Sequence, residues 1–189
     1  MINKRHFIAG LAGMLVLATG CTTTGSGASD PATRRQAIDA GVDNALANLY
    51  RQDPGARQMV EGAKAVLVFP SVLGAGFVVG GSRGDGALRK AGRTVSFHRT
   101  TSGSFGLQAG AQSSAVFILF MTDSALANFE SSRGWTAGVD ATVTLLSVGA
   151  NAQVTSATVQ QPVVGYVLTN QGLMAGLTVD GTRITRLQL

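Results

Sequence analysis

The chain has 189 residues, a net charge of +5 and a single cysteine, and only 13% of its side chains are charged. Its length is enough for one domain of ordinary size and too short for two well-buried ones. One cysteine excludes an internal disulfide, so we expect a single hydrophobic core to hold the fold together.

The first 20 residues have the composition of a signal peptide. Lys4 and Arg5 form a basic start, residues 7–18 form an apolar run, and small residues precede Cys21. The apolar run is too short to cross a bilayer as a helix. Cleavage before Cys21 removes two positive charges and leaves 13 basic and 10 acidic side chains, a net charge of +3.

The stretch ATGC at residues 18–21 resembles the signal of bacterial lipoproteins, in which the cysteine is acylated on sulfur and becomes the mature N-terminus. The resemblance predicts Cys21 as the lipid attachment site, and two or more acyl chains give a stable membrane anchor. By resemblance to Gram-negative lipoproteins, Thr22 in place of aspartate after the cysteine implies sorting to the outer membrane, facing the periplasm or the cell surface. The alternative is a secreted protein with a free thiol. Residues 21–30 are polar and small, which predicts a flexible tether.

Two helices are expected at the start of the folded domain, which we place at residues 31–189. The Asp-Pro pair at 30–31 provides an N-cap and a first helical residue, and apolar residues recur at helical spacing as far as Tyr50. The Asp-Pro pair at 53–54 repeats this signal for a short helix that ends near Gly62. The polar face of the first helix mixes positive and negative charges: Arg34, Arg35, Asp39, Asp43, Asn44 and Asn48.

Short strands dominate the rest of the pattern, beginning with a buried strand from Ala65 that Pro70 closes. A short mid-chain helix over SALANFE, capped by Thr122 or Asp123, interrupts them. The pattern predicts an α+β fold: a large curved antiparallel sheet, a partial barrel or half-open sandwich, with the helices on one side. The remaining strands are expected near residues 76–82, 87–90, 94–99, 104–111, 115–121, 139–148, 153–159, 164–168, 172–179 and 182–187.

The stretch from Phe69 to Arg93 is rich in glycine and ends in basic residues. It lacks the lysine that ends a phosphate-binding P-loop, and its glycines do not have the spacing of a dinucleotide-binding turn. We therefore interpret it as strands that bend and bulge. Its apolar residues are expected in the core: Val68, Phe69, Val72, Leu73, Phe77, Val78 and Val79.

Positive charge is concentrated in the segment from Arg83 to Arg99, where Asp85 is the one acidic residue. Such a cluster is a candidate anion-binding surface, and near an anionic membrane each basic residue contributes about 1 kcal/mol. The alternative is a solvated hairpin whose charges keep its edge from pairing. The candidate head-group residues are Arg83, Arg89, Lys90, Arg93 and Arg99.

Catalytic chemistry has weaker support in the sequence. Ser82 lies in a Gly-x-Ser-x-Gly pattern, but no helix follows it, and His98 is the one histidine left to act as its base after signal cleavage. The carboxylates are scattered and offer no metal-ligand cluster. We expect a protein without enzymatic activity, metal or cofactor, and without a nucleic-acid partner.

Three blocks of the sequence resemble the SYLF lipid-binding domain: AKAVLVFPSVLGAGFVVGGSRGDGAL from residue 63, GSFGLQAGAQ from residue 103 and GYVLTNQGLMAGLTVDG from residue 165. The resemblance implies binding of acidic phospholipids, brings no catalytic residues and covers essentially the whole mature chain. Eukaryotic members bind phosphoinositides and some bind actin. We therefore expect a lipid-anchored envelope protein that binds anionic phospholipid head groups. The alternative is a structural protein of the envelope that docks a protein partner.

Overall fold

In the computed structural model, which describes residues 30–146, 161–169, 172–173 and 179–189, the fold begins with the helix α1 (Pro31–Gln52). The Asp30 carboxylate caps α1 by accepting a hydrogen bond from the Thr33 amide at 3.3 Å. Asp53 ends this helix and caps α2 (Pro54–Gly62), with its carboxylate 2.9 Å from the Gly55 amide. Both predicted helices are confirmed, and the first continues two residues past Tyr50.

Two very long strands follow, β1 (Ala65–Lys90) and β2 (Arg93–Phe120), which pair along their lengths as one antiparallel ribbon. The prediction of many short strands in this region was wrong, because the glycines and serines that indicated turns lie within the ribbon. Its turn is at Ala91 and Gly92, which have φ angles of 46° and 75°. Pro70 does not end β1: the register shifts between Phe69 and Val72, and β1 pairs only with β2 among the described strands.

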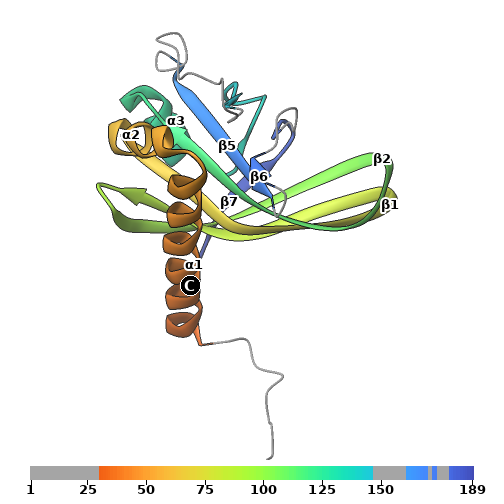
Figure 1. Ribbon diagram of the computed structural model, residues 1–189. Coiled ribbons are helices and arrows are strands. Elements are labelled where there is room, and N and C mark those ends of the chain that lie inside the picture. Colours follow the sequence, from red (N-terminus) through yellow and green to blue (C-terminus); the bar gives the residue numbers. More distant parts are fainter. Residues whose placement is uncertain (1–29, 147–160, 170–171, 174–178) are drawn as a thin grey trace, which may run out of the picture.

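The ribbon folds back on itself, and two glycines make this possible (Figure 1). A Cβ atom on Gly86 would lie 2.2 Å from the Val68 carbonyl oxygen, and one on Gly84 would lie 2.7 Å from that of Ser71. Both distances are far below van der Waals contact, so only glycine allows the two layers to approach this closely. The glycine-rich stretch thus bends and packs strands, as the sequence predicted.

The remaining strands extend the sheet on both sides of β2. They are β3 (Trp135–Thr136), β4 (Thr144–Leu145), β5 (Val163–Thr169), β6 (Gly172–Leu173) and β7 (Arg183–Leu187). Among the described residues the sheet has seven strands, ordered β3-β7-β2-β5-β4, with β1 on β2 and β6 on β5. The predicted curved α+β fold is confirmed, but the sheet is not wholly antiparallel: β4 and β5 are parallel, because the chain between them is long enough to cross over.

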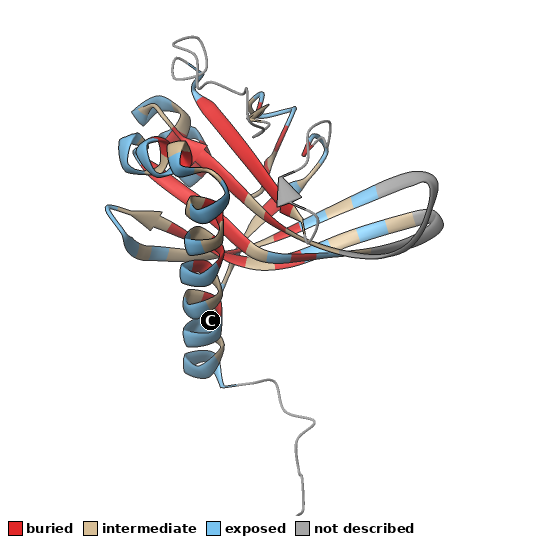
Figure 2. Ribbon diagram, in the orientation of Figure 1, coloured by how far each residue is buried: buried red, intermediate tan, exposed pale blue. Residues whose placement is uncertain are grey.

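Helices cover both faces of the sheet, which corrects the prediction that they lie on one side. The outer face packs against α1 and α2, and Val42, Leu49 and Tyr166 are fully buried there. The inner face packs against α3 (Asp123–Ser131), whose cap is Thr122, and encloses Phe120 and Trp135. Figure 2 shows β5 buried along most of its length between these layers.

Three of the seven residues expected in the core are buried: Val68, Phe69 and Val72. Leu73 was wrongly placed there, since it is 63% exposed, beyond the bulge at which the ribbon leaves the core. The other three, Phe77, Val78 and Val79, belong to β1, and their side chains are not among those that the structure describes. The predicted signal peptide, the tether up to residue 29, the strand at 153–159 and most of the strand at 172–179 also lie outside the described residues.

Candidate functional site

The outer face of the ribbon carries two neighbouring rows of polar residues beside the first turn of α1. In one row Arg83 of β1 lies opposite Thr101 of β2, which lies opposite Arg183 of β7. In the next row Asp85, Arg99 and Thr185 are paired in the same way. Directly opposite residues of antiparallel strands project to the same face, so both rows share one surface.

Asp85 is the centre of this surface. Its carboxylate accepts hydrogen bonds from Arg99 Nε at 2.7 Å and Arg99 Nη2 at 3.0 Å, a bidentate pair, and also from Arg34 Nη2 in the first turn of α1. Burial raises the pKa of Asp85, but the hydrogen bonds from Arg99 and Arg34 outweigh burial, so its pKa lies below the usual value. Asp85 therefore stays ionised and joins α1 to the ribbon.

We call the four arginines of this surface the arginine patch: Arg34, Arg83, Arg99 and Arg183. With Asp85 included the patch carries a net charge of +3. Arg83 and Arg183 are exposed and have no ion pair among the described residues. The Arg183 guanidinium lies over the backbone of Gly134, where a Cβ atom would come within 2.6 Å of its Nη2.

The five predicted head-group residues are not one cluster. Arg83 and Arg99 belong to the arginine patch, whereas Arg89 reaches α1, where it pairs with Asp43 and lies 3.8 Å from Asp39. Lys90 pairs with Glu130 of α3 at 2.7 Å, on the inner side of the sheet. Arg93 follows the turn, exposed and without an ion pair in the described structure.

Two members of the patch, Arg34 and Arg183, were missed from the sequence. Arg34 was assigned to the polar face of a helix, and nothing local shows that this helix crosses the ribbon at Asp85. Arg183 lies in the segment TRITRL, where a strand is expected at residues 182–187, but its apolar residues Ile184 and Leu187 are three positions apart and mark neither face as polar. The expected strand was the available signal, but it does not say which strand is its neighbour. Cys21, the predicted lipid attachment site, lies outside the described residues.

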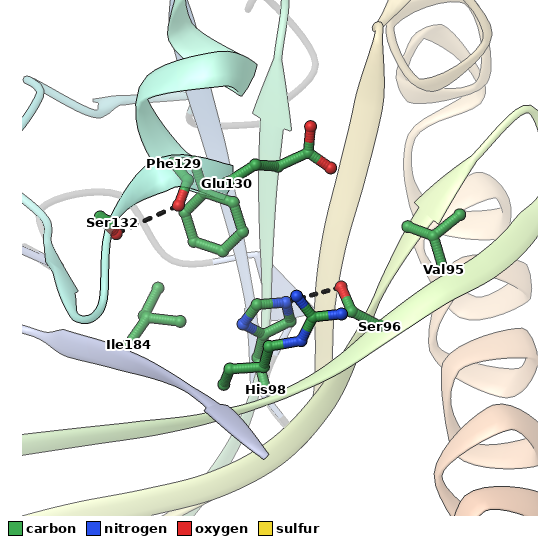
Figure 3. Close-up of a pocket in the computed structure, with 8 residues that line it drawn as sticks. Val95, Ser96, His98, Phe129, Glu130, Ser132 and Ile184 are labelled. Carbon is green, nitrogen blue, oxygen red and sulfur yellow. Dashed lines mark hydrogen bonds between the residues drawn. The ribbon is translucent and has the colours of Figure 1, made fainter. Parts of the chain in front are cut away.

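A shallow pocket of about 90 Å³ lies on the other side of β2, between α3 and β7 (Figure 3). His98 forms its centre: Nε2 is 2.8 Å from the Ser96 hydroxyl, and the ring lies 5.0 Å from that of Phe129. Burial, together with the charge of Arg186, lowers the pKa of His98 to about 4. The imidazole is therefore neutral at physiological pH, and Glu130 at the rim acts weakly in the opposite direction.

Ser82 and His98 do not form a nucleophile–base pair. The Ser82 hydroxyl lies 2.7 Å from that of Ser102, and His98 is opposite Gly86, four residues further along β1. At about 3.3 Å per residue, these positions are roughly 13 Å apart. Within the described part of the chain, no cluster of three or more potential metal ligands occurs, and no helix is long and apolar enough to span a bilayer.

The fold and this surface define an α+β domain whose curled sheet presents arginines beside its first helix. Residues 101–188 match the family model Ysc84, described as Las17-binding protein actin regulator. Residues 101–188 are therefore similar to the Ysc84 (SYLF) family, and the match confirms the predicted resemblance to SYLF proteins for this part of the chain. Thr101 and Arg183 fall within the match, whereas Arg34, Arg83 and Arg99 precede it. No curated protein sequence matches the chain.

Proposed function

We propose that the protein is a lipid-anchored lipoprotein of the bacterial envelope whose domain binds anionic phospholipid head groups through the arginine patch. The observation that carries the proposal is the position of Arg34. It lies in the first turn of α1 and is hydrogen-bonded to Asp85, so the patch begins where the tether from Cys21 joins the domain. An acyl anchor at Cys21 holds this surface close to the bilayer and raises its effective concentration there.

The charges favour this part of the ribbon over the five head-group residues predicted from the sequence. Arg89 and Lys90 are neutralised by carboxylates of α1 and α3, whereas Arg83 and Arg183 are exposed without such partners among the described residues. A net charge of three near an anionic surface contributes about 3 kcal/mol, which is too little for tight binding alone. We therefore assign the anchor most of the affinity and the patch the choice of head group and orientation. The proposed role includes no catalytic step.

The test uses residues 22–189, which lack the acylated cysteine and contain every described element. Co-sedimentation with vesicles that contain phosphatidylglycerol or cardiolipin should exceed that with neutral vesicles, and should fall with rising salt. The double variant Arg83→Gln/Arg183→Gln should lose this preference. The matched control Lys90→Gln/Arg93→Gln removes the same charge elsewhere and should retain more of it. Equal binding to neutral and anionic vesicles would contradict the proposal.

A second candidate is a structural role in the envelope, in which the domain docks a protein. Two observations favour it: the matched family is described as Las17-binding, and the free edge of β1 has no pairing strand in the described structure. Unpaired strand edges accept strands from other chains. Crosslinking in intact cells that yields one stoichiometric partner, without any vesicle binding by residues 22–189, would favour this role.

A further inference from the structure

The Asp85 carboxylate fixes two guanidinium groups that come from different elements. Arg99 is on the neighbouring strand, where the sheet register already holds its backbone opposite Asp85. Arg34 is on α1, 51 residues away in the sequence, and its side chain is 36% exposed. A free arginine side chain samples many rotamers, so the contact with Asp85 restrains Arg34 much more than Arg99.

Held in this way, Arg34 lies beside the exposed arginines of the patch. Arg83 is two residues from Asp85 on the same face of β1, roughly 7 Å along the strand. Arg183 lies two strands away in the same row, roughly 10 Å across the sheet. Arg34 uses Nη2 for Asp85, and its Nε and Nη1 have no partner among the described residues. Arg34 and Arg83 thus lie on one face of the ribbon, and Arg183 adjoins them at β7, where its guanidinium lies over the backbone of Gly134.

We propose that Asp85 is a positioning residue that makes Arg34, Arg83 and Arg183 one discrete site for a single phosphate group. The inference rests on the proposed function and deepens it, because it replaces a diffuse attraction between charges with a defined geometry. Phosphate oxygens accept paired hydrogen bonds from planar guanidinium groups, and such contacts need fixed side chains. The negative charge of Asp85 repels a phosphate. Asp85 therefore favours binding only through the position that it gives to Arg34.

The ionisation of Asp85 supports this role. Although burial favours its neutral form, hydrogen bonds from both arginines keep its pKa below the usual value. The negative potential of an anionic membrane, about 30–50 mV, lowers the pH at its surface by less than about one unit, which is too little to protonate Asp85. Asp85 keeps its charge, and with it the position of Arg34, in the place where the phosphate is met.

Two variants that each remove one negative charge test the inference, by whether they strengthen or weaken binding to vesicles that contain phosphatidylglycerol. Asp85→Asn and Asp43→Asn in residues 22–189 each raise the net charge by one, and Asp43 lies outside the patch, paired with Arg89. If charge alone matters, both variants bind more tightly. We expect Asp85→Asn to bind about tenfold more weakly than the wild type, because charge-assisted contacts are lost, and Asp43→Asn to bind at least as well as the wild type. Equal binding by the two variants overturns the inference.

Arg34→Gln keeps the Asp85–Arg99 pair and decides the matter if Asp85→Asn unfolds. It should weaken binding more than Arg51→Gln, which removes the same charge from the last turn of α1, where Arg51 contacts Asn48. Equal effects of these two variants also overturn the inference. A wild type that fails to prefer anionic vesicles overturns instead the proposed function, so the two failures are distinguishable.

Inorganic phosphate is the second probe, titrated while the arginine Nε–H signals are followed by NMR. Saturable binding of one phosphate that disappears in Asp85→Asn means that the site takes a free phosphate group. Dependence on Asp85 with vesicles alone means that it takes the phosphate of a lipid. Both results support the positioning role, and independence from Asp85 with both probes contradicts it.

Discussion

Arg89 of β1 pairs with Asp43 of α1, and this contact decides what the basic segment of the hairpin can do. The Arg89 side chain is 14% exposed, and its Nη2 also lies 3.3 Å from the Asp39 carbonyl oxygen. Asp39 in turn accepts a hydrogen bond from Thr94 at 2.6 Å. A residue that sequence alone places on a lipid-facing hairpin thus fastens the hairpin to the first helix.

Replacing Arg89 by glutamine should therefore reduce stability and leave vesicle binding almost unchanged. The variant leaves two carboxylates of α1 without their cation, and we expect the free energy of unfolding to fall by about 1–2 kcal/mol, since the pair is partly exposed. Urea denaturation measures this loss, and co-sedimentation with phosphatidylglycerol vesicles measures binding. A stable variant with strongly reduced vesicle binding would instead show that Arg89 takes part in head-group binding.

The fold of the ribbon predicts a sharp difference between two glycines. Gly86→Ala places a methyl group 2.2 Å from the Val68 carbonyl oxygen and 2.6 Å from the Phe69 ring, so the folded-back layers must separate. We expect a loss of about 3 kcal/mol or more. Gly103→Ala meets nothing within 4 Å and should change stability by less than about 1 kcal/mol, in the stabilising direction. Thermal unfolding compares the two, and similar melting temperatures would contradict the close approach of the layers.

Local signals predicted the helices well, because a cap is decided within a few residues. Thr122 illustrates this: its hydroxyl accepts from the Ala125 amide at 3.2 Å, four residues cover the whole interaction, and the sequence shows all of them. The ribbon could not be predicted in the same way. Glycine, serine and proline indicate turns, yet here Pro70 and Gly86 lie within one strand, and only the packing of a distant layer shows why.

The arginine patch was half predicted for the same reason. Arg83 and Arg99 are close in the sequence and paired by one hairpin, so their proximity follows from a local charge count. Arg34 and Arg183 join them through the crossing of α1 and the pairing of β7 with β2, which are long-range features. Asp39 and Asp43 on the mixed polar face of α1 gave the one hint that this helix neutralises basic partners.

The proposed acyl anchor at Cys21 gives a prediction that does not depend on the patch. Cys21→Ser removes the thiol that the lipoprotein signal requires, so labelling of the full chain with radioactive palmitate should disappear. After cell fractionation the variant should move from the membrane fraction to the soluble fraction. Arg83→Gln/Arg183→Gln is the control, because it should keep the label. A labelled Cys21→Ser protein would exclude this cysteine as the attachment site.

The buried His98 predicts that the stability of the fold depends on pH. This prediction is independent of the proposed lipid binding. The residue is 8% exposed and its ring packs against Phe129, and burial together with Arg186 lowers its pKa from 6.5 to about 4. Between these pH values His98 is protonated in the unfolded chain and neutral in the folded protein. The stability is therefore fully present above about pH 6.5 and is lost as the pH falls towards 4, by on the order of 3 kcal/mol.

Urea denaturation at several values between pH 4.5 and 7 measures this slope. The window lies above the lowered pKa of Asp85, so that carboxylate contributes little to it. His98→Gln keeps a polar group near Ser96 and removes the titration, so its stability should be lower at pH 7 and nearly independent of pH across the window. Arg186→Gln removes the neighbouring positive charge, should raise the pKa of His98 and should make the slope shallower. An unchanged slope in His98→Gln would show that another group titrates on unfolding.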